Sequence, residues 1–222
     1  MFVLFACRVQ AQISPTFLNH STERSSGYIY GLRAGLNIAR VSNHSPIAAN
    51  SRLGFMAGIY ADNSLGKFTG IRHELTYSRQ GFRFSHPNAS GKVDLQYIYI
   101  TNLFVLDVGH ILQVHIGPQV GYLLNAIGDT VQNLNSNTAH DFFSLNGQTN
   151  RFLFGGCAGL EVYPWKGLLL GFRYNLSFSP FNKREYNNSF YNREAARTGL
   201  YSENNAALRQ EIFQITCGWR WH

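Results

Sequence analysis

Regular alternation of apolar residues with polar or very small ones limits the fold of this chain more than any other feature. Over residues 111–124 the even positions carry Leu, Val, Ile, Pro, Val, Tyr and Leu, while the odd positions include Gln, His and Gly. Successive side chains of a β-strand point to opposite faces, so this segment predicts a strand with one apolar face. The pattern recurs at about residues 28–38, 53–61, 68–84, 93–108, 152–162, 168–178 and 211–221, and it is least regular at 68–84 and 93–108. The sequence therefore predicts eight strands.

The connections between these segments are alternately short and long. The short ones are residues 62–67, 109–110 and 164–167, and the longer ones are 42–52, 85–92, 125–150 and 182–208. Outer-membrane barrels have short periplasmic turns and longer external loops, with aromatic girdles at both interfaces. Aromatic residues gather at both ends of the expected strands. The sequence contains no run of 18 apolar residues, so no transmembrane helix is expected. We therefore predict an all-β, eight-stranded, antiparallel up-and-down transmembrane β-barrel.

The composition of the two strand faces predicts which face lines the lumen. One face carries large apolar and aromatic residues, and the other is rich in glycine. The second face also holds the charged residues Arg33, Arg72, Glu74, Glu161, Arg173 and Arg220. An arginine facing lipid at the bilayer midplane costs about 2–4 kcal/mol, and an eight-stranded barrel has an interior just wide enough for side chains. We expect these six residues to form a structural polar network in the lumen, with Glu74 and Glu161 as partners of several arginines. The alternative places the arginines in water at the barrel ends.

Several residues fit this pattern poorly or extend it. His73 takes an outward position, and so does Pro118, where the missing N–H leads us to expect a bulge. The phase of the fourth strand is left open because residues 103–106 are all apolar. Cys157 points inward and Cys217 outward, two strands and roughly 10 Å apart. Because a disulfide does not span that distance, both are predicted to be free thiols.

The N-terminal residues resemble the end of a secretion signal. A short apolar stretch leads to Val9-Gln10-Ala11, which is similar to a cleavage site. We predict that residues 1–11 are the remnant of a secretion signal, 12–27 a periplasmic N-terminal segment and 28–222 the outer-membrane barrel. An alternative takes Cys7 as a lipoprotein cleavage site.

Motifs for catalysis and for nucleic-acid binding are missing from the sequence. The net charge of +7 is scattered, without a run of five to eight Lys or Arg, so no nucleic-acid partner is expected. Nucleophile-elbow, zinc-protease, phosphate-loop and C-x-x-C patterns do not occur, and the histidines lack metal-ligand spacing. We expect no enzymatic activity, cofactor or metal. One alternative is a lipid-modifying enzyme at the external rim, using Ser42, His44, Ser45, His140 and Asp141; another is a narrow pore.

Several segments together resemble the PorT-like outer-membrane β-barrel family of Gram-negative bacteria. The matching stretches are Tyr30 to Asn37, Gly54 to Gly58, Glu74-Leu75 with Tyr77-Ser78 and Gly81-Phe82, Ile116 to Leu124 and Gly171 to Asn175. The chain departs from the family at Tyr99-Ile100-Thr101, where a proline is usual. It also departs at its end, Trp221-His222, because the last residue is His222 and the family usually ends in an aromatic residue. Pro118 fits the family pattern.

This resemblance implies a place in the cell outer membrane, contact with outer-membrane lipid and delivery by the barrel-assembly machinery. Most members have no defined activity, and one branch is linked to secretion and gliding. We expect a structural or interaction role, in which loops 125–150 and 182–208 bind a protein partner.

Overall fold

The computed structural model describes residues 27–42, 48–86, 89–109, 111–134, 137–147, 149–181 and 209–221. These residues form nine strands: β1 (Tyr28–Ser42), β2 (Ala48–Ser64), β3 (Thr69–His86), β4 (Ala89–Val108), β5 (Leu112–Leu134), β6 (Asn137–Ser144), β7 (Phe152–Trp165), β8 (Leu168–Ser177) and β9 (Arg209–Arg220). Within these ranges, no helix has the length and apolar character needed to cross a membrane. The predicted secretion signal and most of the predicted periplasmic segment lie outside the described residues.

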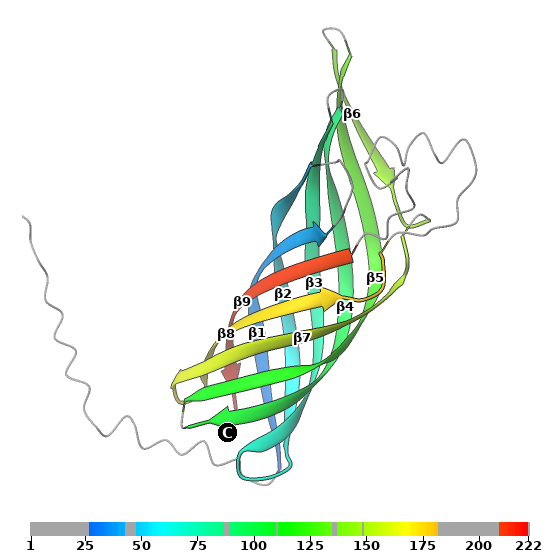
Figure 1. Ribbon diagram of the computed structural model, residues 1–222. Helices are drawn as coiled ribbons and strands as arrows, with labels where there is room; N and C mark the ends of the chain where they lie inside the picture. Colours follow the sequence, from blue (N-terminus) through cyan, green and yellow to red (C-terminus); the bar gives the residue numbers. More distant parts are fainter. Residues whose placement is uncertain are drawn as a thin grey trace, which may run out of the picture.

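Eight of the nine strands close into a barrel (Figure 1). Each strand of the ring β1-β2-β3-β4-β5-β7-β8-β9 pairs with the next, β9 pairs back with β1, and every pairing is antiparallel. In a closed ring every strand has a hydrogen-bonding neighbour on both sides, so no edge is left. A sheet that spans a membrane needs this closure because hydrocarbon offers no hydrogen bonds to unpaired backbone groups. The predicted eight-stranded up-and-down barrel is confirmed.

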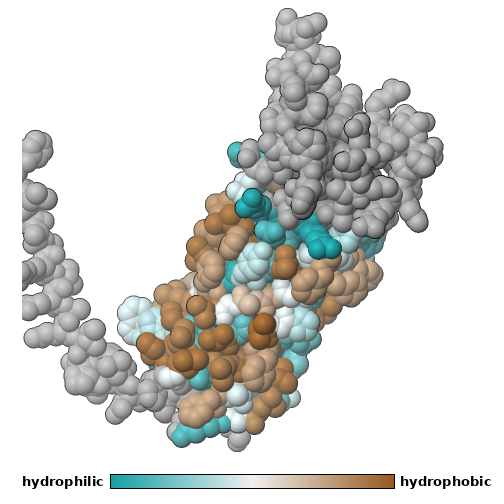
Figure 2. All heavy atoms as spheres, in the orientation of Figure 1, coloured by the Kyte–Doolittle hydropathy of each residue, from teal (hydrophilic) through white to brown (hydrophobic). Residues whose placement is uncertain are grey.

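The alternation of the sequence corresponds to the two faces of the barrel wall. On β5, for example, Ile116 has 61% of its surface exposed, whereas His115 beside it has 1%. Brown apolar spheres cover most of the visible wall of the barrel (Figure 2). Aromatic residues stand at both ends of this apolar band; Tyr28, Phe68, Trp165 and Trp221 lie at the short-turn end, and Tyr122, Phe152 and Phe178 at the long-connection end.

Polar residues of β4 set the phase that its sequence left open. Leu103 and Val105 point inward and pack with Cys157, whereas Phe104 and Leu106 point outward. Thr101 and Asp107 share the inward phase and are buried. Because a one-residue slip would turn these polar groups to lipid, the phase of the apolar stretch follows from its neighbours.

The expected bulge at Pro118 does not form, and that prediction is wrong. The β4–β5 register is the same on both sides of the proline, at Thr101↔Gln119 and at Phe104↔Ile116, and the shift in this pair lies at Gln96/Tyr97 instead. The ladder only skips the residues opposite Pro118 and Gly117. Gly117 allows the close approach there, since a Cβ at this position would lie 1.9 Å from the Asn102 carbonyl oxygen.

The segment predicted as loop 125–150 is largely strand. β5 continues to Leu134, β6 returns antiparallel to it, and the upper part of β5 also pairs with β4 up to Ala89↔Gln132. The upper part of β5 and β6 were not recognised in the sequence because their residues are mostly polar. A pair of strands outside the membrane needs backbone hydrogen bonds but no apolar face, so it leaves no alternating pattern. We call residues 89–94 of β4, 127–134 of β5 and 137–144 of β6, which pair with one another above the barrel ring, the blade. The blade rises at the top of Figure 1. Loop 182–208 lies outside the described residues.

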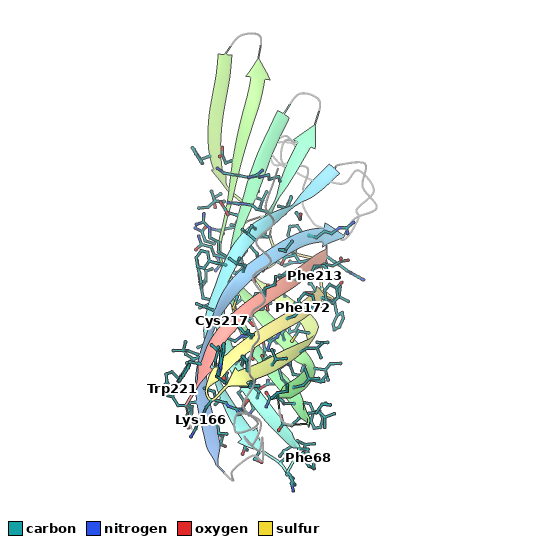
Figure 3. All side chains as sticks on the ribbon, turned by 90° about the vertical axis from the view of Figure 1, so that its left-hand side faces the viewer. Phe68, Lys166, Phe172, Phe213, Cys217 and Trp221 are labelled. Atoms are coloured by element: carbon teal, nitrogen blue, oxygen red, sulfur yellow. The ribbon has the colours of Figure 1, made fainter. Side chains whose placement is uncertain are left out.

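The two cysteines of the barrel are free, as predicted. Cys157 is buried in the lumen, and Cys217 is exposed on the outer wall of β9 (Figure 3), where its register partners are Ala34 of β1 and Leu170 of β8.

Candidate functional site

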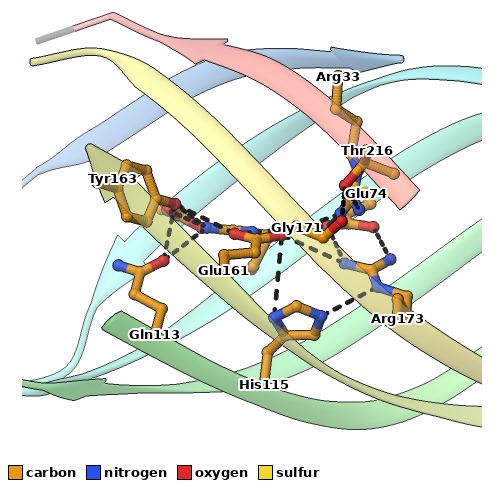
Figure 4. Close-up of polar contacts among 11 residues, drawn as sticks. Arg33, Glu74, Gln113, His115, Glu161, Tyr163, Gly171, Arg173 and Thr216 are labelled. Atoms are coloured by element: carbon orange, nitrogen blue, oxygen red, sulfur yellow. Dashed lines mark hydrogen bonds and ion pairs between the residues drawn. The ribbon is translucent and has the colours of Figure 1, made fainter. Parts of the chain in front are cut away.

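Five of the six charged residues predicted for the lumen are joined by hydrogen bonds inside it (Figure 4). Arg173 of β8 donates to both carboxylate oxygens of Glu74 on β3, at 2.6 and 2.9 Å. Arg33 of β1 bridges the two acids, donating to Glu74 at 2.8 Å and to Glu161 of β7 at 3.3 Å. Arg72 donates to Glu161 at 2.5 Å. Alternate positions on four strands thus converge on one point because all of them face inward.

Asp62 is a further carboxylate of this network and was not predicted. Its two oxygens accept hydrogen bonds from Arg72 Nε at 2.6 Å and Nη2 at 3.1 Å. The sequence placed Asp62 in a turn, although it continues the inward phase of Met56 and Tyr60 on β2. The described core of the network therefore holds three guanidinium groups and three carboxylates, so its formal charges balance.

Neutral polar and aromatic side chains complete the coordination of the network. Gln113 and Tyr163 accept hydrogen bonds from Arg72, each at 3.1 Å. His115 Nε2 accepts one from Arg173 Nε at 3.0 Å, which requires that this nitrogen carry no proton. Gly159 leaves room for this imidazole, since a Cβ there would lie 2.5 Å from Nε2. Such partners offset the cost of removing charges from water, which ion pairing alone seldom repays.

Arg220 lies at the short-turn end of the lumen and takes a different role. Its guanidinium stacks over the ring of Tyr163 at 4.2 Å from the centroid. Arg72 stacks in the same way over Tyr60, at 4.4 Å. Cation–π contacts of this kind let a cation be buried against an aromatic face.

The middle of the lumen contains neutral hydrogen-bonded side chains. Asn37 Nδ2 donates to Ser78 Oγ at 2.8 Å, and Gln80 Nε2 donates to Tyr99 at 2.8 Å and to Gln210 at 2.6 Å. Two cavities of about 10 Å³ each border this layer, both lined in part by Tyr99 and Gln119. A cavity of that size holds roughly one water molecule.

An apolar cluster closes the long-connection end of the lumen. Strand residues and two residues from connections pack together there; the members are Phe82, Val93, Leu95, Tyr97, Tyr99, Leu123, Ala126, Leu145, Leu153 and Phe181. Leu145 follows β6 and Phe181 follows β8, and both are fully buried. The Asn150 N–H donates to the Phe181 carbonyl at 2.7 Å and so joins the two connections. We call this cluster the apolar cap.

The described residues offer no arrangement suited to metal binding, since no group of three His, Cys, Asp or Glu side chains lies close enough to hold an ion.

An apolar groove of about 380 Å³ does lie on the outer wall, between β5, β7 and β8, lined by residues such as Pro118, Gly156 and Phe178. Its lining suits hydrocarbon and not a polar substrate. The rim residues considered for lipid chemistry, Ser42, His44, Ser45, His140 and Asp141, have side chains outside the described part of the structure.

About nine-tenths of the chain is similar to several solved bacterial structures. The attachment invasion locus protein Ail of Yersinia pestis has a TM-score of 0.49 and 11% identity, with 89% of this chain and 100% of that chain covered. Neisserial surface protein A has a TM-score of 0.47 and 13% identity, with coverages of 88% and 100%. OprG of Pseudomonas aeruginosa has a TM-score of 0.41 and 9% identity, with coverages of 90% and 98%.

Sequence comparison identifies a family and no individual relative. No curated protein matches the chain. A family model described as "Outer membrane protein beta-barrel domain" matches residues 10–183, well over half of the sequence.

Proposed function

Because this chain belongs to the outer membrane protein beta-barrel domain family, it is a protein of the outer membrane, and we propose that it is a non-catalytic barrel that presents the blade to a protein partner. The location agrees with the sequence prediction. The role assigned to the blade extends the expectation that loop 125–150 binds a partner.

The observation that carries this proposal is the edge of β6. Among the described strands, β6 pairs with β5 alone, so the backbone of its other side has no ladder partner there. An exposed strand edge is a template onto which an extended segment of another protein can add. Phe142 on β6 has 69% of its surface exposed, which adds a large aromatic anchor beside that edge.

The packed lumen supports an interaction role over a pore. Among the described residues, the charged network, the neutral layer and the apolar cap succeed one another along the axis, and two cavities that border the neutral layer each have space for about one water molecule. We assign the lumen a structural role: it supports the wall from inside. Within the family, the resemblance of Tyr30 to Asn37 and of Glu74-Leu75 favours the PorT-like branch of Gram-negative bacteria, which remains part of this proposal.

Site-specific photo-crosslinking in intact outer membranes tests the role of the blade. A photoreactive amino acid at Phe142 is expected to give an adduct of one defined mass. The matched control carries it at Trp165, which is also exposed but lies at the short-turn end. Replacing residues 129–142 by Asn-Gly, a turn suited to joining the remaining strands, should abolish binding while the barrel still folds. No adduct at Phe142, or the same adduct at Trp165, would contradict the proposal.

A further inference from the structure

Two polar side chains form a pair on the lipid-facing wall of the barrel. His73 of β3 and Asn102 of β4 are register partners, both are exposed, and His73 Nδ1 lies 2.6 Å from Asn102 Oδ1. The neighbouring outward residues are Ile71 and Leu75 on β3, and Ile100 and Phe104 on β4. The pair therefore lies inside the apolar band and not at its border.

This pair is exceptional among the described outward positions of the band. Between the two aromatic girdles, the other described positions carry aliphatic or aromatic residues, Cys, Pro or Gly. A polar group facing hydrocarbon is costly, and in membrane proteins such groups usually face a protein partner. Lipid chains offer no hydrogen-bonding group at this depth, so lipid cannot satisfy the pair.

The chemistry of the pair indicates which partner would satisfy it. The Asn102 Oδ1 can only accept, so His73 donates from Nδ1, and the Nε2 of the neutral ring is left as an acceptor. Asn102 Nδ2 is left as a donor, and neither nitrogen bonds to another described residue. One acceptor and one donor side by side are self-complementary, because a two-fold axis brings each onto the opposite group of a second copy.

We propose that two copies of this chain associate within the outer membrane about a two-fold axis that passes beside His73 and Asn102. Across the axis, Asn102 Nδ2 of each copy donates to His73 Nε2 of the other. Leu75 and Ile100 pack on one side of these hydrogen bonds, and Ile71 and Phe104 pack on the other. This association uses the lipid-facing wall and is independent of the proposed role of the blade.

Crosslinking in lipid vesicles provides the test, because the chain contains its own control position. Cys217 is exposed on the outer wall of β9, three strands from β3 in one direction and four from β4 in the other. The full chain with Cys7→Ser is refolded into phospholipid vesicles and treated with a short bismaleimide. A Leu75→Cys, Cys217→Ser variant of it should give a crosslinked dimer, whereas the chain that keeps Cys217 should not.

Leucine substitutions separate association from folding. His73→Leu with Asn102→Leu should weaken dimerisation roughly tenfold, as expected for the loss of two hydrogen bonds in a bilayer. Its thermal stability should be unchanged or higher, since two polar groups leave the lipid-facing wall. Folding is checked by the gel mobility of unheated and heated samples. A monomer at every protein-to-lipid ratio, equal crosslinking through Cys217, or unchanged dimerisation of the leucine variant would each overturn the proposal.

Discussion

At the scale of single residues, the lumen depends on carboxylates that each serve more than one arginine. Glu74 accepts from Arg33 and Arg173, and Glu161 accepts from Arg33 and Arg72. All of these side chains are buried, so bulk water is not in contact with them to replace a lost partner. Removing one member of such a network leaves an uncompensated charge, which costs more than the intact pair contributes.

Replacing Glu161 with Gln should lower the free energy of unfolding by about 3–5 kcal/mol, because Arg72 and Arg33 then lose their shared counter-charge. The measurement is the denaturant midpoint of refolding in detergent. Lys166→Gln is the control, since this lysine is exposed in the turn between β7 and β8 (Figure 3) and should change stability by about 0.5 kcal/mol or less. An unchanged midpoint for the Glu161 variant would mean that the network does not hold the barrel together.

At the scale of elements, the blade and the ring differ in how many neighbours hold each strand. Every ring strand has ladder partners on both sides, whereas β6 has described partners on β5 alone. β6 also lies above the apolar band, where water can compete for its backbone groups. Local stability is therefore expected to fall from the ring toward β6. A partner strand that pairs with the other edge of β6 would raise the local stability of β6.

Hydrogen exchange in detergent micelles should show this difference directly. Amides of residues 113–121 in the lower part of β5 should be protected for much longer than amides of residues 137–144, because the former open only with the whole barrel. Mass spectrometry of peptic peptides measures both segments in one sample, and the Glu161→Gln variant controls for global unfolding. Equal protection of the two segments would show that the blade is an integral part of the folded ring.

At the scale of the whole molecule, the barrel is a filled cylinder with an apolar exterior. Its exposed wall meets lipid, and its interior is occupied by the charged network, the neutral layer and the apolar cap. Among the described residues, two small cavities near Tyr99 have volumes of about 10 Å³ each, which is space for roughly one water molecule. The molecule is therefore suited to hold elements at the membrane surface more than to move solutes through it.

Planar-bilayer recordings should show no stable conductance for the folded protein. The charged network occupies the lumen with paired side chains, which leaves ions no hydrated path. A variant with Leu145→Ser and Phe181→Ser, which opens the apolar cap alone, should also stay closed, because the network below it is intact. Discrete channel openings in the unaltered protein would favour the pore that the sequence left as an alternative.

The sequence alone determined the eight strands of the ring and, for all of them except β4, the face that meets lipid. These follow from period-two alternation and from the alternating lengths of connections, which are local properties of the chain. It also brought Arg33, Arg72, Glu74, Glu161 and Arg173 to one face, although it could not say which of them touch.

Only the tertiary structure decided the contacts across the lumen, because closure and register bring together residues far apart in the chain. Glu161 and Arg33, for example, are 128 positions apart. Asp62 was missed because its role depends on how far β2 extends, and the phase of β4 depends on its neighbours. The blade and the apolar cap were missed for a related reason: backbone pairing above the membrane and the packing of Leu145 and Phe181 leave no periodic pattern in the sequence.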